Sequence, residues 1–215
     1  MNYCLRVIVH LDRLARNYKI LSNSVNSKRL MAVVKANAYG HGAIECSKTL
    51  EDQGCDFFSV FTVEEAKELR IAGLKSDILI LSKLEKESIQ TAIDNDLIVN
   101  ISSIDDLDSI IFHLEKNGLS PRFHMKIETG MNRLGFDLSD ISLSIGKLLD
   151  YKNLNCEGIY THYATSDEGD LSYAHLQQER FEQALEIANE MGYTFKYKHI
   201  SNSGGLLNEL CSNTN

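Results

Sequence analysis

The chain has 215 residues, of which 43% are hydrophobic and 24% are charged, with 13 glycines, one proline and a formal net charge of −8. This composition is typical of a globular protein and excludes a disordered or fibrous chain. Basic residues occur in isolated pairs such as Lys28 and Arg29, so the charge pattern argues against nucleic acid as a partner.

Cysteine usage and hydropathy indicate a cytoplasmic location. The five cysteines are widely spaced and form no CxxC pair, which fits neither a zinc site nor a disulfide framework. No apolar run reaches the ~18 residues of a membrane-spanning helix, and the N-terminus lacks the features of a signal peptide. We therefore expect a reducing cytoplasm, no metal, and no membrane contact from this chain.

Hydrophobic periodicity predicts short apolar strands that alternate with amphipathic helices. The candidate strands cover 4–9, 30–35, 57–61, 78–81, 97–101, 122–127, 156–161 and 196–200. The candidate helices cover 14–25, 41–53, 62–73, 85–95, 103–117, 139–149, 172–191 and 202–210. The predicted apolar stripe of 172–191 consists of Leu176, Phe181, Leu185 and Ala188. Thr62 with Glu65, and Ser103 with Asp106, have the spacing of helix N-terminal capping pairs.

This alternation implies a parallel sheet with right-handed crossovers. The strands from 30–35 onward are each followed by a helix, and their even spacing favours a TIM-type (β/α)8 barrel over an open doubly wound sheet. After the seventh βα unit the sequence ends in the polar stretch CSNTN. We therefore expect an α/β barrel that is truncated and lacks its eighth strand.

Functional residues of a parallel barrel gather at the carboxyl ends of its strands. The residues at those positions are Lys35, Tyr39, Leu81, Lys126, Arg133, His162, His199, Asn202 and Ser203. Most of them are cations, hydroxyls or imidazoles. Glu128 and Asp167 lie nearby, and we expect no catalytic role for either.

Lys35 follows the apolar run LMAVV and precedes ANAYGHG. A typical lysine in this position reaches solvent, whereas a buried amine has a lowered pKa and can form a Schiff base with a carbonyl group. Tyr39 adds a hydroxyl in a loop whose backbone N–H groups can meet an anion. Ser203 adds a second hydroxyl, with helix capping as its alternative role. A lysine for an aldehyde and a cradle for a phosphate are what pyridoxal 5′-phosphate (PLP) requires.

Four motifs, AVVKANAYGHG, KIETGMNRLGF, THYATSDEGD and HISNSGG, resemble in the same order the PLP-binding barrel domain of alanine racemases, including their serine-racemizing relatives. The resemblance implies that Lys35 holds PLP as an internal aldimine and acts as one of two catalytic bases. It also implies that Tyr39 and Ser203 bind the cofactor phosphate, with Asn202 beside it.

The resemblance assigns the other site residues as well. It implies that Arg133 hydrogen-bonds the phenolic oxygen of PLP and helps to place the substrate carboxylate, a task suited to a guanidinium group. His162 would contact the pyridine ring, and Leu81 would pack against it. Lys126 matches a position that is carbamylated in many members of the family and supports the arginine.

The family pattern continues beyond this sequence, with an eighth strand and a β-rich domain that supplies the second catalytic base across a dimer interface. The resemblance thus makes residues 1–10 a strand that pairs with that domain, and residues 11–215 an incomplete barrel. Because racemization needs a base on each face of the substrate, we expect weak PLP binding and poor activity from this chain alone. A full-length form is expected to be a homodimer.

The implied function is PLP-dependent interconversion of the L- and D-forms of a small amino acid, alanine or serine, which supplies D-amino acids for peptidoglycan synthesis. The sequence leaves the choice of substrate open. Three alternatives are a non-catalytic single-domain PLP carrier, a decarboxylase of basic amino acids, and a remnant that binds no ligand. The decarboxylases usually have a glycine-rich phosphate loop and a C-terminal catalytic cysteine, and neither is seen here.

Overall fold

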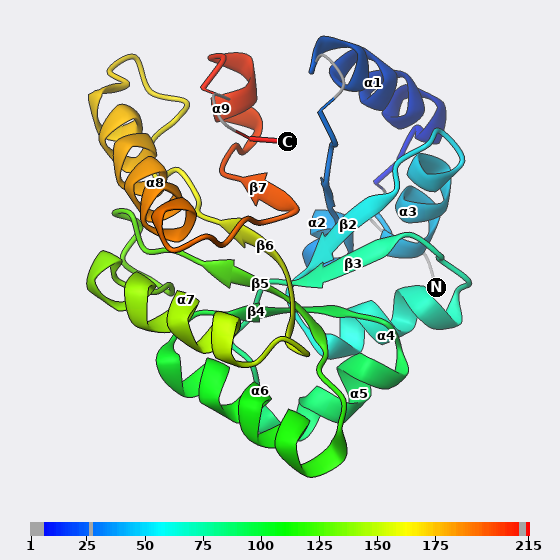
Figure 1. The fold of residues 1–215 in the computed structure, drawn as a ribbon. Coiled ribbons are helices and arrows are strands. Elements are labelled where there is room, and N and C mark those ends of the chain that lie inside the picture. Colours follow the sequence, from blue (N-terminus) through cyan, green and yellow to red (C-terminus); the bar gives the residue numbers. More distant parts are fainter. Residues whose placement is uncertain (1–6, 26–27, 211–213) are drawn as a thin grey trace. The chain divides into compact units, whose positions relative to one another are not determined.

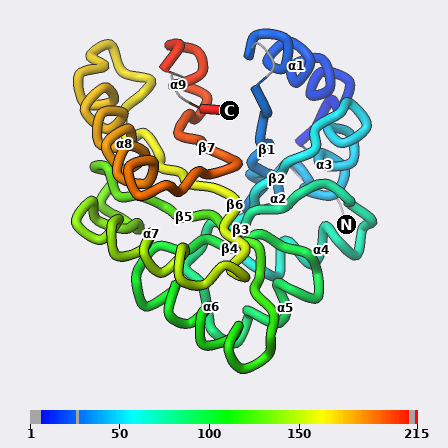
Figure 2. The backbone as a smooth tube through the Cα atoms, in the orientation of Figure 1, coloured from blue at the N-terminus to red at the C-terminus, as the bar shows by residue number. Residues whose placement is uncertain are grey.

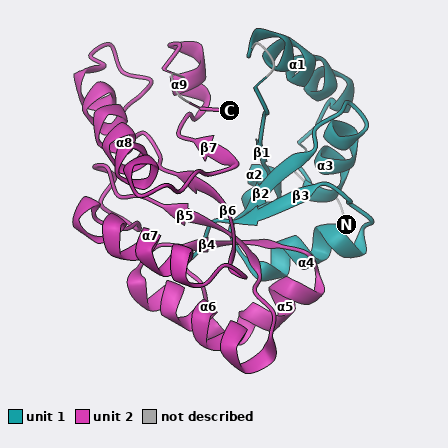
Figure 3. Ribbon diagram, viewed as in Figure 1, with its two compact units in different colours: residues 1–82 teal, residues 83–215 magenta. Residues whose placement is uncertain are grey.

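The computed structural model describes residues 7–25, 28–210 and 214–215. The chain divides into two compact units, residues 1–82 and residues 83–215 (Figure 3). Each unit contains parallel strands that are followed in the chain by helices (Figure 1).

Unit 1 contains three parallel strands. They are β1 (Ala32–Val33), β2 (Phe57–Val60) and β3 (Asp77–Ile80). Ala32 of β1 lies opposite Phe58 of β2, and Phe57 lies opposite Asp77 of β3. All four residues of β2 are buried, which is typical of a parallel sheet that is covered on both faces.

The helices of unit 1 are α1 (Leu11–Ser24), α2 (Lys35–Gly40), α3 (Ala43–Glu51) and α4 (Val63–Ile71). Helix α3 contacts both α1 and α4. The predicted capping pair at the start of α4 is confirmed. The Thr62 hydroxyl accepts a hydrogen bond from the Glu65 N–H at 3.2 Å, and the Glu65 carboxylate accepts one from the Thr62 N–H at 3.2 Å. This capping box fixes where α4 begins.

Unit 2 contains four parallel strands, paired in chain order. They are β4 (Ile98–Ile101), β5 (Arg122–Lys126), β6 (Asn155–Tyr160) and β7 (Tyr197–His199). The register between β5 and β6 shifts so that Phe123 lies opposite Cys156 and His124 opposite Gly158. The residue skipped by this shift, Glu157, accepts two hydrogen bonds from Arg122, at 3.0 and 2.9 Å.

The helices of unit 2 are the 3-10 helices η1 (Lys86–Ser88) and η2 (Leu138–Asp140), and α5 (Ile89–Asp94), α6 (Ile104–Asn117), α7 (Ile141–Asp150), α8 (Ser172–Glu190) and α9 (Ser203–Leu207). The second predicted cap is also confirmed, because the Ser103 hydroxyl accepts a hydrogen bond from the Asp106 N–H at 3.2 Å. Helix α6 is followed by Gly118, which has a φ of 73° and supplies the left-handed residue that commonly terminates helices.

The predicted order of strands and helices from residue 30 onward is confirmed, while three predictions along the chain differ in detail from the structure. The strand predicted over 30–35 is reduced to β1, which leads directly into α2 (Figure 2). Of the strand predicted over 4–9, residues 4–6 lie outside the described residues, and residues 7–9 have no regular secondary structure. In α8, Leu176 is 38% exposed, and the buried face includes Gln177 instead. Closure by an eighth unit, and the division at residue 10, stay predictions.

Candidate active site

Lys35 opens a short turn of unusual backbone geometry. The following four residues, Ala36 to Tyr39, have φ between 51° and 55° and ψ between 38° and 49°, so α2 is a left-handed turn. An L-residue is less stable in this conformation by roughly 1–2 kcal/mol, and none of the four is a glycine. The sequence prediction that Lys35 ends a strand is therefore wrong, because the strand ends at Val33 and Lys35 begins this turn.

A set of hydrogen bonds holds this left-handed turn. The Ala38 N–H donates to the Val34 carbonyl at 2.8 Å, and the Ala36 N–H donates to the Glu65 carboxylate at 2.7 Å. The Asn37 side chain accepts from the Ala43 N–H at 2.7 Å, which ties the turn to the start of α3. Strained backbone persists where the surroundings determine it, and such places cluster at functional sites.

The turn brings the Lys35 amine close to the ring of Tyr39, with Nζ 6.0 Å from the ring centroid. Lys35 is half-buried, and Tyr39 is 60% exposed. Within the described part of the chain, neither the amine nor the Tyr39 hydroxyl has a hydrogen-bond partner. Unit 1 thus presents an amine without a carboxylate beside an accessible hydroxyl. Also in unit 1, Leu81 follows β3, and its N–H donates to the Val60 carbonyl at 2.9 Å.

Lys126, the last residue of β5, is 7% exposed, and its Nζ lies 5.7 Å from the centroid of the Tyr160 ring. Burial raises the pKa of Tyr160, and the positive charge of Arg133 opposes that rise. Arg133 itself is exposed. Unit 2 therefore brings two of the predicted site cations, Lys126 and Arg133, into the electrostatic environment of one buried tyrosine.

The loop that carries Arg133 is held by Glu128. The Glu128 carboxylate accepts hydrogen bonds from the Gly130 N–H and from the Arg133 N–H, the latter at 3.3 Å. Gly135 has a φ of 145°, and a Cβ there would lie 2.4 Å from the Glu128 backbone nitrogen. Close packing against Glu128 therefore requires a glycine at position 135. The Glu128 carboxylate positions the backbone of the loop.

His162 and Asn202 occupy different environments in unit 2. The His162 carbonyl accepts a hydrogen bond from the Gln177 amide at 3.0 Å, and the histidine is half-buried. The Asn202 side-chain oxygen caps α9 by accepting from the Gly205 N–H at 2.9 Å, and it also accepts from the Ser166 hydroxyl at 2.5 Å. Capping of α9 thus falls to Asn202, and Ser203 is exposed with its hydroxyl unpaired among the described residues.

Sequence reasoning placed His199 at a strand end but missed the cluster of side chains that surrounds it in unit 2. The Tyr160 hydroxyl donates to the Asn100 side chain at 2.9 Å, and the Tyr160 ring stacks on His199. His124 Nδ1 lies 3.0 Å from His199 Nε2. Burial lowers the pKa of His199 to about 3, so its imidazole is neutral at physiological pH. The alternation of His124 with Lys126 on β5, which puts both on one face, was the available signal.

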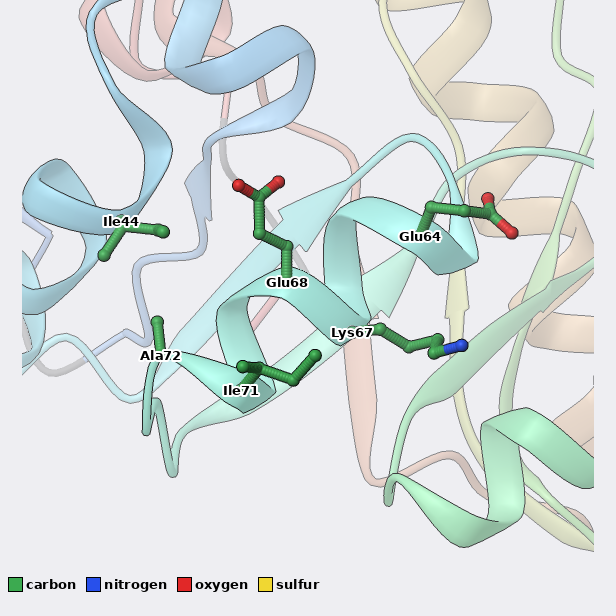
Figure 4. A pocket seen from close by; sticks show the side chains of 6 residues that line it. All are labelled: Ile44, Glu64, Lys67, Glu68, Ile71 and Ala72. Carbon is green, nitrogen blue, oxygen red and sulfur yellow. The ribbon is translucent and has the colours of Figure 1, made fainter.

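A shallow pocket of about 360 Å³ lies elsewhere in unit 1, between α3 and α4. Figure 4 shows its lining side chains, with the Lys67 amine pointing away from Ile44. Its remaining lining residues are Glu64, Glu68, Ile71 and Ala72. None of the predicted site residues lines this pocket. In the described ranges, every helix is too short or too polar to cross a membrane.

Similar proteins are alanine racemases. The chain is 37% identical over 201 residues to an alanine racemase of Methanococcus maripaludis, covering 93% of this chain and 54% of that protein. It is 36% identical over 203 residues to alanine racemase 2 of Caldanaerobacter subterraneus, covering 94% of this chain and 52% of that protein. The chain thus spans about half the length of these relatives.

Solved structures give the same result. The alanine racemase of Clostridium difficile matches with a TM-score of 0.88 and 30% identity, covering 95% of this chain and 53% of that one. The alanine racemase of E. faecalis matches with a TM-score of 0.85 and 33% identity, covering 92% of this chain and 53% of that one. Residues 9–215 also match the family model of the alanine racemase N-terminal domain. The chain therefore belongs to the alanine racemase N-terminal domain family.

Proposed function

We propose that this chain is the PLP-binding portion of an amino-acid racemase and that Lys35 carries the cofactor through its amine. Family membership and the surroundings of Lys35 support this function. The observation that carries the proposal is the half-buried Lys35 amine, which has no carboxylate partner among the described residues and lies 6.0 Å from the Tyr39 ring.

The donor set fits a cofactor that has an aldehyde, a phenolic oxygen and a phosphate. The polar side-chain groups of Lys35, Tyr39, Arg133 and Ser203 all lack hydrogen-bond partners within the described ranges. An amine suits the aldehyde, a guanidinium suits an anionic oxygen, and two hydroxyls suit a phosphate. These groups are chemically complementary to PLP, and within the described ranges no protein hydrogen bond occupies them.

When bound, PLP withdraws electron density from the α-carbon of an attached amino acid and so makes its proton removable. We assign to Lys35 the exchange of that proton at Nζ on one face of the substrate. Arg133 binds the phenolic oxygen and the substrate carboxylate, and Lys126 supports it. Tyr39 and Ser203 hold the phosphate beside Asn202. His162 and Leu81 contact the pyridine ring.

Inversion at the α-carbon requires a proton to leave from one face and return to the other. Lys35 can serve one face, so we propose that the second base belongs to a further domain of a full-length homodimer. This chain alone is then expected to interconvert the enantiomers poorly. The proposed substrate is a small amino acid, alanine or serine, in the cytoplasm, and the proposed role is supply of D-amino acids for peptidoglycan. The proposed domain is a barrel over residues 11–215.

PLP binding tests this function directly. PLP is added to the 215-residue chain, to Lys35→Ala and, as a control, to Lys48→Ala. Lys48 is exposed on α3. We expect a visible absorption band with the wild type and with Lys48→Ala, and none with Lys35→Ala. Borohydride reduction followed by peptide mass mapping should place the cofactor on Lys35. A strong band in Lys35→Ala would contradict the proposed attachment, and efficient racemization by this chain alone would contradict the two-base assignment.

A further inference from the structure

We propose that Glu65 is a positioning residue that holds the left-handed turn after Lys35 and thereby orients the Lys35 amine. This inference rests on the proposed function, because it concerns the residue that we propose to carry PLP. The hydrogen bonds on which it depends lie within unit 1 and are donated by backbone amides. The inference can therefore also be tested without the cofactor.

The Glu65 carboxylate accepts three backbone hydrogen bonds from two separate segments. Oε1 accepts from the Ala36 N–H at 2.7 Å. Oε2 accepts from the Phe61 N–H at 2.7 Å and from the Thr62 N–H at 3.2 Å. Capping of α4 explains the Thr62 contact, but it does not require the contacts with Ala36 and Phe61. One carboxylate therefore joins the segment after β1 to the segment after β2.

The Ala36 contact lies at the start of the strained turn. Ala36 is the first of the four left-handed residues, and its N–H belongs to the peptide that directly follows Lys35. Fixing the plane of that peptide restricts the Lys35 backbone and hence the direction of its side chain. Four consecutive non-glycine residues in this conformation need external support, and Glu65 is the side chain that supplies it at the lysine end of the turn.

Both carboxylate oxygens are needed for this role. A glutamine at position 65 keeps one acceptor oxygen, so it can bind Ala36 or the Phe61 and Thr62 pair, but not both. Hydrogen bonds that involve a charged group are also stronger than neutral ones. The single oxygen makes two hydrogen bonds at the Phe61 and Thr62 end but only one at Ala36, so we expect Glu65→Gln to release the Ala36 N–H with little change in side-chain size.

The experiment compares Glu65→Gln with two matched controls in the 215-residue chain. Thr62→Ala removes the other half of the capping box, because Thr62 Oγ1 accepts from the Glu65 N–H, and it leaves the carboxylate in place. Glu64→Gln removes the same charge from an exposed neighbouring position of α4. Glu65→Asp, which keeps the charge but is shorter, serves as a second variant if Glu65→Gln does not fold.

Two measurements are made on each variant. The first is amide hydrogen exchange at Ala36 without PLP, which reports local opening of the turn. The second is the rate at which the visible band of Lys35-attached PLP appears. In Glu65→Gln we expect Ala36 exchange to become about tenfold faster and attachment about tenfold slower, as for the loss of one charged hydrogen bond. The two controls should change either rate by less than about threefold.

The results separate the two proposals. Wild-type exchange at Ala36 in both Glu65 variants would overturn the positioning role. Equal effects of Thr62→Ala and Glu65→Gln would also overturn it, because Glu65 would then act only as a cap of α4. If PLP attaches to none of the proteins, the proposed function fails. The contrast in Ala36 exchange still decides whether Glu65 holds the turn.

Discussion

The ring of Tyr160 lies parallel to the imidazole of His199, with the ring centroids 4.7 Å apart and an angle of 3° between the planes. The two residues end neighbouring strands, β6 and β7, at paired positions. The His124 ring also contacts His199, with its Nδ1 3.0 Å from His199 Nε2, so the His199 imidazole lies against two rings. This packing removes part of the solvent around the imidazole, and the loss of solvation disfavours its charged form and lowers its pKa.

We predict that His199 makes the stability of the fold depend on pH. The pKa of His199 is about 3 in the folded chain, against about 6.5 when unfolded, so the unfolded state binds more protons between these values. The contribution of His199 to the free energy of unfolding should be complete above pH ~6.5 and fall by at most about 1.4 kcal/mol per pH unit toward pH 3. Denaturant unfolding between pH 7 and 4 measures this slope. His199→Gln should reduce it, whereas His175→Gln, at an exposed position, should not. An unchanged slope in His199→Gln would contradict the assignment.

Gly158→Ala should destabilise unit 2. A Cβ at Gly158 would lie 2.8 Å from three atoms of the His124 ring, which is 0% exposed and cannot move into solvent. Overpacking of this kind typically lowers the free energy of unfolding by about 1–3 kcal/mol. Gly146→Ala is the matched control, since its site on α7 is open and alanine favours helix, so a gain of up to about 1 kcal/mol is expected. Thermal unfolding of both variants and the wild type measures these changes in stability. Equal stability of Gly158→Ala and the wild type would contradict the close contact.

Local sequence chemistry was enough to predict most of the elements. Alternating apolar runs located the strands, and the pairs Thr62 with Glu65 and Ser103 with Asp106 located the starts of α4 and α6. These features depend on residues that are near in sequence, so a single chain reveals them. The candidate residues Lys35 and Tyr39 could be paired in the same way, because only four positions separate them.

Features that depend on pairing between strands could not be predicted. The register shift that places Gly158 against His124 has no signature in either strand, yet it decides which rings meet in unit 2.

The left-handed turn was also missed. Its residues Ala36 to Tyr39 contain no glycine, and the contacts that hold it come in part from Glu65, far along the chain. Propensity argues against such a turn, and tertiary contacts override it.

Ala36→Gly should stabilise the chain, which is opposite to the usual effect of introducing glycine. Ala36 has a φ of 51° and is exposed, so glycine relieves backbone strain there without removing a buried contact. The relief of backbone strain should outweigh the cost of the greater entropy that glycine gives the unfolded chain. The free energy of unfolding should therefore rise by about 0.5–1 kcal/mol. Ala72, at a φ of −70°, is the control, and Ala72→Gly should lose a similar amount. Denaturant unfolding measures both, and a loss of stability in Ala36→Gly would contradict a strained turn.

Glu128→Gln should weaken PLP binding through the loop that carries Arg133. The two carboxylate oxygens of Glu128 accept from the Gly130 and Arg133 N–H groups. Glutamine retains one acceptor, so one of these amides loses its partner and the Arg133 backbone becomes less constrained. If Arg133 holds the cofactor as proposed, the dissociation constant for PLP should rise about three- to tenfold, in line with the loss of one hydrogen bond. Titration of the visible band measures this change.

The loop explanation is separated from a general effect of charge by two further variants. Glu168→Gln removes the same charge from an exposed position and should leave PLP binding unchanged. Arg133→Ala removes the proposed ligand itself and should weaken binding more than Glu128→Gln does. In the double variant the second change should add little, because Glu128 acts through Arg133. Additive losses would show that Glu128 affects the cofactor by another route, and normal binding in Glu128→Gln would show that its hydrogen bonds do not position the arginine.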